Sequence, residues 1–118
     1  MTNEFRYTLV LKIGDIEQFN DVATRIIAEI ESEAGTLVFQ MYFDEQNSKC
    51  VIYERFADSD AWITHGKTHA ATVLLPELFM HSDIERFEVL GDVSDEAKRI
   101  MDGMGATYLK RTMGFEKR

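Results

Sequence analysis

The stretch of sequence that decides the fold is Phe5-Arg6-Tyr7-Thr8-Leu9-Val10-Leu11-Lys12-Ile13. Every odd-numbered residue in it is large and apolar, whereas most of the even-numbered residues are polar or charged. Side chains of a β-strand point alternately to opposite faces, so this alternation predicts a strand with one face in the core. We expect the rest of the chain to build outward from that strand.

A helix is predicted directly after this strand. Asp15 and Gln18 form a capping-box pattern, which is typical of a helix start. Apolar residues then recur at helical spacing from Ile16 to Ile30, and Gly35 is a typical residue just after a helix. The predicted helix therefore covers residues 16–34.

The next two segments predict a β-hairpin. Alternation of apolar and polar residues returns in residues 36–43, and residues 50–56 are again strand-like. The segment between them, residues 44–48, is a run of polar residues typical of a turn.

A second helix and a fourth strand follow the hairpin. Asp58 or Ser59 can cap the helix, which we expect to continue, with a break near Pro76, to about Met80. Residues 84–90 predict the strand.

The predicted order β-α-β-β-α-β indicates a ferredoxin-like α+β sandwich with both helices on one face of an antiparallel sheet. The other face carries apolar side chains such as Val10 and Tyr42, and a second copy of the same sheet is the simplest cover for it. We therefore expect a homodimer. Each subunit is predicted to be a single domain, residues 1–118, with its core in residues 4–91.

A C-terminal extension, residues 92–118, follows this core. A helix capped by Ser94 is expected to run to about Met101, and residues 106–115 are strand-like. The extension is too apolar to be disordered and too short to fold alone. We expect it to pack on its own subunit or on the partner.

Composition and charge limit the classes of function. A chain of 118 residues, 45% hydrophobic, is long enough for one ordinary core. The formal net charge of −8 argues against nucleic acid as a partner. Residues 1–97 hold 7 basic and 19 acidic side chains, and residues 98–118 hold 6 and 2, so the extension is basic (+4) and the rest acidic (−12).

Location can also be inferred from the sequence. No apolar run approaches the roughly 18 residues that span a membrane, and the N-terminus lacks the pattern of a signal peptide. The single cysteine, Cys50, fits a reducing compartment. We therefore expect a cytoplasmic protein without membrane contact.

Three passages resemble the antibiotic biosynthesis monooxygenase-like family of the dimeric α+β barrel superfamily. They are residues 51–56 (VIYERF), 58–65 (DSDAWITH) and 88–92 (EVLGD), and residues 114–117 (GFEK) are similar to the tails of quinol monooxygenases in this family. The resemblance implies a homodimer with a small-molecule pocket in each subunit. Some family members oxidise quinols or phenols with molecular oxygen and without flavin, metal or haem.

The resemblance therefore leads us to expect a cofactor-independent monooxygenase acting on a small aromatic or quinol-like molecule and oxygen. A non-catalytic dimeric barrel that binds a small hydrophobic ligand is the alternative, and a scaffold with a vestigial pocket is a third possibility. Fold alone does not decide among them. Haem degradation is disfavoured, because related haem-degrading enzymes use an Asn on the first strand and residues 5–13 contain none.

His65 is the candidate catalytic residue that the resemblance implies. A neutral imidazole in the pocket could accept a proton from a phenol or quinol. Trp62, one helical turn earlier, could stack on a flat substrate or simply pack against the sheet. His69 shares a helix face with His65, which makes it a candidate substrate contact. Two histidines are too few to hold a metal, so no metal site is predicted.

Tyr53 and Arg86 are the other candidate substrate-binding residues. A Tyr hydroxyl could hydrogen-bond a quinone carbonyl, and an Arg could hold an anionic oxygen. Because Arg86 has Glu85 and Glu88 near it in the sequence, a surface or inter-subunit ion pair is the competing interpretation.

Overall fold

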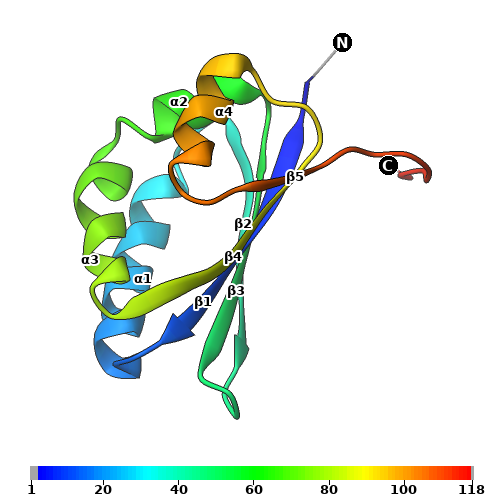
Figure 1. Ribbon diagram of the computed structural model, residues 1–118. Helices are drawn as coiled ribbons and strands as arrows, with labels where there is room; N and C mark the ends of the chain where they lie inside the picture. The colour runs from blue at the N-terminus through cyan, green and yellow to red at the C-terminus, as the bar shows by residue number, and fades with distance from the viewer. Residues whose placement is uncertain (1–2, 118) are drawn as a thin grey trace.

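The computed structural model describes residues 3–117 as a five-stranded sheet with its helices packed on one face (Figure 1). The strands are β1 (Phe5–Ile13), β2 (Thr36–Asp44), β3 (Lys49–Phe56), β4 (Ser82–Leu90) and β5 (Thr107–Leu109). The helices are α1 (Ile16–Ile30), α2 (Ser59–His65), α3 (Leu75–Phe79) and α4 (Asp95–Asp102), and a π-helical turn (Ala70–Leu74) leads into α3.

The strands lie in the order β2-β3-β1-β4-β5. All neighbours are antiparallel except β4 and β5, which are parallel and make the sheet mixed. The first four strands and the helices between them have the predicted β-α-β-β-α-β order, so the ferredoxin-like α+β fold is confirmed. None of the helices that the structure describes lies over the opposite face of the sheet (Figure 1).

The first strand has the burial that its sequence predicts. Its odd-numbered side chains, Phe5 to Ile13, are buried beneath the helices, and its even-numbered side chains are half-buried or exposed on the other face. Asp15 caps α1 by accepting a hydrogen bond from the Gln18 backbone N–H at 3.1 Å, as the capping-box pattern predicts. Local sequence signals therefore place the first strand and the start of the first helix.

The end of the first helix was predicted wrongly. The helix stops at Ile30, four residues before the predicted end. A Cβ on Gly35 would collide with the Cβ of Ala61, so glycine is required here because α2 packs closely on this turn. Glycine at position 35 is therefore needed for the close packing of the turn against α2, and it does not mark the end of α1.

The second helix is interrupted earlier than predicted. The break lies at residues 66–69, and Pro76 sits in the first turn of α3, where the missing N–H of a proline costs nothing. The Thr68 hydroxyl accepts a hydrogen bond from the Ala71 backbone N–H at 3.3 Å. This hydrogen bond satisfies a backbone N–H at the start of the π-helical turn, which no carbonyl of that turn can reach. Gly66 and Thr68 are the sequence signals for this break.

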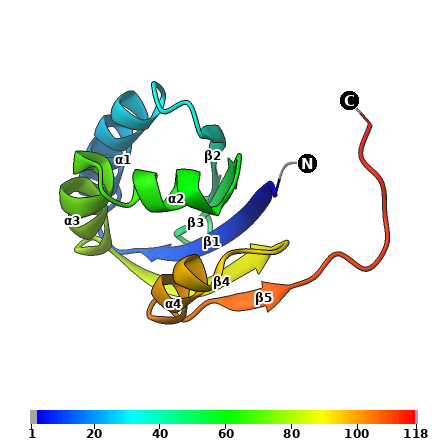
Figure 2. The same ribbon diagram turned by 90° about the horizontal axis from the view of Figure 1, so that it is seen from above.

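The strand predicted over residues 106–115 is present only at Thr107–Leu109. It pairs with the last three residues of β4, and the final bond of this pairing runs from the Gly91 N–H to the Leu109 carbonyl at 3.0 Å. The chain after β5 runs on the bare side of the sheet (Figure 2), where Glu116 forms ion pairs with Arg6 at 3.8 Å and with Arg55 at 3.5 Å. Met113 and Phe115 are 88% and 83% exposed, so this subunit does not bury them.

Within residues 3–117, no helix is both long enough and apolar enough to cross a membrane.

Candidate functional site

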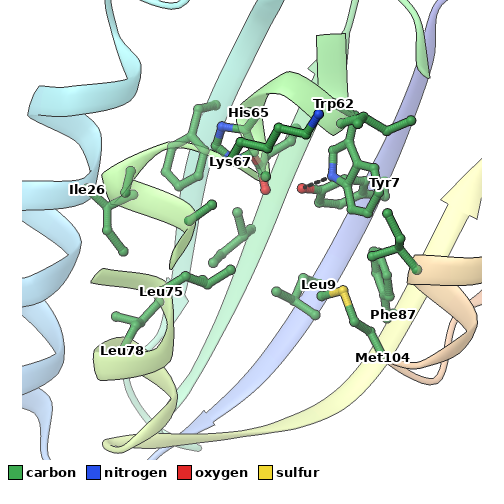
Figure 3. A pocket seen from close by; sticks show the side chains of 18 of the residues that line it. Tyr7, Leu9, Ile26, Trp62, His65, Lys67, Leu75, Leu78, Phe87 and Met104 are labelled. Atoms are coloured by element: carbon green, nitrogen blue, oxygen red, sulfur yellow. Dashed lines mark hydrogen bonds between the residues drawn. The ribbon is translucent and has the colours of Figure 1, made fainter. Parts of the chain in front are cut away.

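An apolar cavity of about 340 Å³ lies between the sheet and the helices (Figure 3). Its floor is formed by inward-facing residues of β1, β2, β3 and β4, including Leu9, Phe39, Ile52 and Phe87. Its other walls come from α1, α2, the π-helical turn, α3, α4 and Met104 just after α4. The volume is that of a small-molecule pocket.

A polar group of three side chains, Glu54, Tyr7 and Trp62, lies on the wall of this apolar cavity. Glu54 on β3 is only 5% exposed, and it lies directly opposite Tyr7 of the neighbouring strand β1. The indole Nε1 of Trp62 donates to the Tyr7 oxygen at 3.4 Å (Figure 3). The second carboxyl oxygen, Oε1, has no hydrogen-bond partner among residues 3–117.

Burial changes the acidity of this group. It raises the pKa of Glu54 from 4.5 to about 7, and the charge of Glu33 adds to the rise while the hydrogen bond from Tyr7 opposes it. Burial and the neighbouring Glu54 also raise the pKa of Tyr7 well above its usual value. Near neutral pH, Glu54 is therefore able both to release and to accept a proton, as an acid–base catalyst does.

His65 and Trp62, the two residues predicted on the second helix, both line the cavity. His65 Nδ1 lies 2.6 Å from Glu33 Oε1, so the carboxylate accepts the Nδ1 proton and leaves Nε2 to act as a base. The His65 ring centre is 5.4 Å from that of Phe56. Trp62 is also buried in the core, so it packs against the sheet and forms part of the cavity wall at the same time.

The remaining predicted residues are not in the cavity. His69 is exposed and pairs with Glu29, with 2.9 Å between Nδ1 and Oε2. Tyr53 and Arg86 lie on the bare face of the sheet, beside Thr8 and Val10 of β1 respectively. The structure therefore does not bring these three residues together with His65 and Trp62.

Tyr53 and Arg86, the two predicted residues on the bare face, each contact a neighbouring side chain of the same face. The Tyr53 hydroxyl is 3.4 Å from Arg6 Nη1, and Arg86 forms an exposed ion pair with Glu88 at 2.8 Å. The surface ion pair that its neighbours suggested for Arg86 is the one observed.

Glu54 was not predicted as a site residue, although its position in the sequence of β3 marks it as a buried carboxyl. It is the one charged position in the inward-facing row of β3, whose other members are Cys50, Ile52 and Phe56. It also lies directly opposite Tyr7 in the sheet. A carboxyl that interrupts an apolar row points to a functional site, because burying a charge is costly.

The described residues offer neither a metal site nor a reactive thiol. Among residues 3–117, no three His, Cys, Asp or Glu side chains are placed so that they could hold one metal ion. Cys50 is fully buried, and burial raises the pKa of its thiol to about 11. A thiol with so high a pKa is a poor nucleophile near neutral pH.

Residues 6–73 match the family model of antibiotic biosynthesis monooxygenases. The chain belongs to this family. Among solved structures, MupZ from Pseudomonas fluorescens is similar with a TM-score of 0.79 and 20% identity, over 99% of this chain and 91% of MupZ. SnoaB from Streptomyces nogalater, a cofactor-independent oxygenase, is similar with a TM-score of 0.67 and 15% identity, over 78% of this chain and 95% of SnoaB.

A conserved protein from Methanosarcina mazei is similar with a TM-score of 0.65 and 16% identity, over 73% of this chain and 87% of that protein. No curated protein matches the sequence. At these identities the structural similarities establish the fold of this antibiotic biosynthesis monooxygenase family member, and its chemistry has to be argued from its own cavity.

Proposed function

We propose that this protein is a cofactor-independent monooxygenase that acts on a small aromatic or quinol-like molecule with molecular oxygen. The observation that carries the proposal is the cavity, in which an apolar, aromatic-lined space contains the buried carboxyl of Glu54 and the ring of His65. Membership of the monooxygenase family and the fold shared with a cofactor-independent oxygenase support it.

The chemistry needs a proton acceptor and a dry pocket. A quinol that loses a proton becomes electron-rich enough to reduce oxygen itself. One oxygen atom then enters the ring and the other leaves as water, so that a quinol and O₂ yield a hydroxylated quinone and H₂O. The protein's tasks are to bind the ring, remove the proton and exclude water.

Two residues in the cavity can accept the proton. His65 is the base predicted from the sequence, and its pairing with Glu33 would hold the ring with Nε2 available. Glu54 is a second acceptor, because burial has moved its pKa to about 7. Trp62 and Phe87 offer aromatic surfaces against which a flat ring can pack.

We also propose that the protein is a homodimer formed through the bare face of the sheet. That face carries Val10, Val38 and Val51, which are half-buried, and Tyr42, which is 57% exposed. Such apolar positions on a sheet without a covering layer favour association. Light scattering on the purified protein is expected to give twice the mass of 13.6 kDa, and a monomer at micromolar concentration would contradict the proposal.

The proposed reaction is tested with an oxygen electrode. The purified protein, treated with a chelator, is given a panel of quinols and anthrones, and products formed under ¹⁸O₂ are analysed by mass spectrometry. We expect oxygen uptake together with one labelled oxygen atom in the product. Saturable binding of these compounds without oxygen uptake would instead favour the non-catalytic barrel that binds a hydrophobic ligand.

A further inference from the structure

Glu33 and His65 form a largely buried pair that joins the turn after α1 to the last residue of α2. Their side chains are 17% and 11% exposed, and the imidazole Nδ1 lies 2.6 Å from Oε1 of the carboxylate. The Thr36 hydroxyl donates a second hydrogen bond, at 2.8 Å, to the same oxygen. Hydrogen bonds to an ionised group are strong, and burial removes the competing water. The pair therefore holds the His65 ring in one orientation.

The turn that carries Glu33 is fixed against α2 by contacts of its own. The Gly35 carbonyl accepts a hydrogen bond from the Ala57 backbone N–H at 2.9 Å. Gly35 also lies so close to Ala61 of α2 that a Cβ at position 35 would collide with it. These contacts involve neither side chain of the pair. The position of Glu33 opposite His65 is therefore set in advance by the packing of the turn on α2.

The chain contains a second pair of the same residue types. Glu29 precedes Glu33 by four residues and His69 follows His65 by four, and 2.9 Å separates the His69 Nδ1 from the Glu29 Oε2. These two side chains are 61% and 39% exposed for His69 and Glu29 respectively, and neither lines the apolar cavity. An exposed pair contributes little, because water competes for both partners. The two pairs therefore differ in burial and in contact with the cavity.

Glu33 can reach a molecule in the cavity only through the imidazole. Of the pair, His65 alone lines the apolar cavity. Both residues line a second hollow of about 250 Å³ between the turn after α1 and α2. The carboxylate thus binds one side of the ring, at Nδ1, and leaves Nε2 to the cavity.

The proposed reaction makes a particular demand on its base. A quinol and O₂ yield a hydroxylated quinone and H₂O without net release of a proton, so a proton taken from the ligand has to be kept and then returned to the oxygen that leaves as water. While it is kept, the O–H bond of the ligand is broken and an Nε2–H bond of His65 is formed. Since Nδ1 stays protonated, the ring is then positively charged. A buried positive charge is costly unless an opposite charge lies beside it.

We propose that Glu33 is a positioning residue of the catalytic site, which fixes His65 in the Nδ1–H tautomer and balances the charge of the imidazolium that forms when Nε2 takes a proton from the ligand. The inference rests on the proposed function for the proton transfer, whereas the tautomer is a property of the ligand-free protein. It extends the site beyond the cavity wall to the turn after α1.

The first test is nitrogen NMR of the ligand-free protein at a pH where His65 is neutral, because the two ring nitrogens then give separate signals. We expect the Nδ1–H tautomer in the wild type. Glu33→Gln should keep it, since an amide oxygen accepts both the Nδ1 proton and the Thr36 hydroxyl proton. Glu33→Ala should lose it, because the Nδ1 proton has no acceptor left. An Nε2–H tautomer in the wild type, or an unchanged tautomer in Glu33→Ala, would overturn the inference.

The second test measures kcat and KM with a quinol that the wild-type protein oxidises. Glu33→Gln keeps the tautomer and lacks the charge, so kcat should fall at least about tenfold. KM should change by less than about twofold, because Glu33 does not contact the ligand. Glu33→Ala loses tautomer and charge together, and its kcat should fall about 10²-fold or more.

Glu29→Gln is the matched control, since it makes the same chemical change in the exposed pair, and it should keep both constants. Circular dichroism checks that the variants are folded, and Glu33→Gln preserves the size and the hydrogen bonds of the residue that it replaces. A wild-type kcat in Glu33→Gln, or an equal fall in Glu29→Gln, would contradict the inference.

The outcomes separate this inference from the proposed function. If the wild-type protein takes up no oxygen with any quinol, the proposed function fails and the tautomer alone decides whether Glu33 positions His65. If the wild type oxidises a quinol and both Glu33 variants do so equally well, the proposed function stands and this inference fails.

Discussion

Substituting Glu54 by Gln should change how the stability of the protein depends on pH. The pKa of Glu54 is about 7 in the folded protein and close to 4.5 in the unfolded chain, because burial disfavours the charged form. The folded protein therefore binds this proton more tightly than the unfolded chain does. The resulting stabilisation is fully present below pH 4.5 and is lost as the pH rises through 7.

The size of the effect follows from the separation of the two pKa values. Each unit of difference corresponds to about 1.4 kcal/mol, so the free energy of unfolding should fall by about 3 kcal/mol between pH 4.5 and pH 8 from this residue alone. In a domain of this size that corresponds to about 10 °C in melting temperature. Gln cannot ionise, so Glu54→Gln should lack this contribution.

The assay is urea unfolding followed by circular dichroism across this pH range, at fixed protein concentration so that any dimerisation contributes equally. Other carboxyl groups also titrate, and the informative quantity is the difference between wild type and variant. Glu45→Gln, on the exposed β2–β3 turn, is the matched control and should follow the wild type. If Glu54→Gln showed the same pH dependence as the wild type, the buried-carboxyl argument would be refuted.

Three further outcomes are expected. Replacing His65 by Ala should lower turnover of an accepted quinol by about 10²–10⁴-fold, whereas the same change at His69, outside the cavity, should have little effect. Cys50 should stay unreactive toward a thiol reagent at pH 8 until urea unfolds the protein, because it is buried and its pKa is about 11. Deleting residues 112–118 should weaken dimerisation at least about tenfold in sedimentation experiments while preserving the circular dichroism of the rest, since their exposed apolar side chains are left to bury against a partner.

The boundaries that the sequence predicted well are those set by neighbours in the chain. Asp15 caps α1 and Ser94 caps α4 by bonding to a backbone N–H three residues later, an interaction contained within one helical turn. The boundaries it predicted wrongly depend on distant residues. Gly35 is required by the approach of Ala61, and the strand after residue 106 ends at Leu109, beside the point where the chain turns at Gly91 after β4.

The residues of the candidate site also fall into those that local spacing could place and those that only tertiary packing could place. Helical spacing correctly placed His65 and Trp62 on one wall, because one turn of a helix is a local repeat. Tyr53 and Arg86 were chosen by residue type, and the pleat of the sheet turns both away from the cavity. The cavity exists only where strands β1 to β4 meet the helices, which no single segment can reveal.

The sequence by itself determined the order of strands and helices, the inward face of β1 and the family of the chain. These features follow from periodicity and from short motifs, both of which act over a few residues. Only the tertiary structure decided that Glu54 stands opposite Tyr7 beside Trp62, with one carboxyl oxygen unused. The physical reason is that a pKa near 7 and an unpartnered acceptor arise from the removal of water, and water is removed only when segments far apart in the chain pack together.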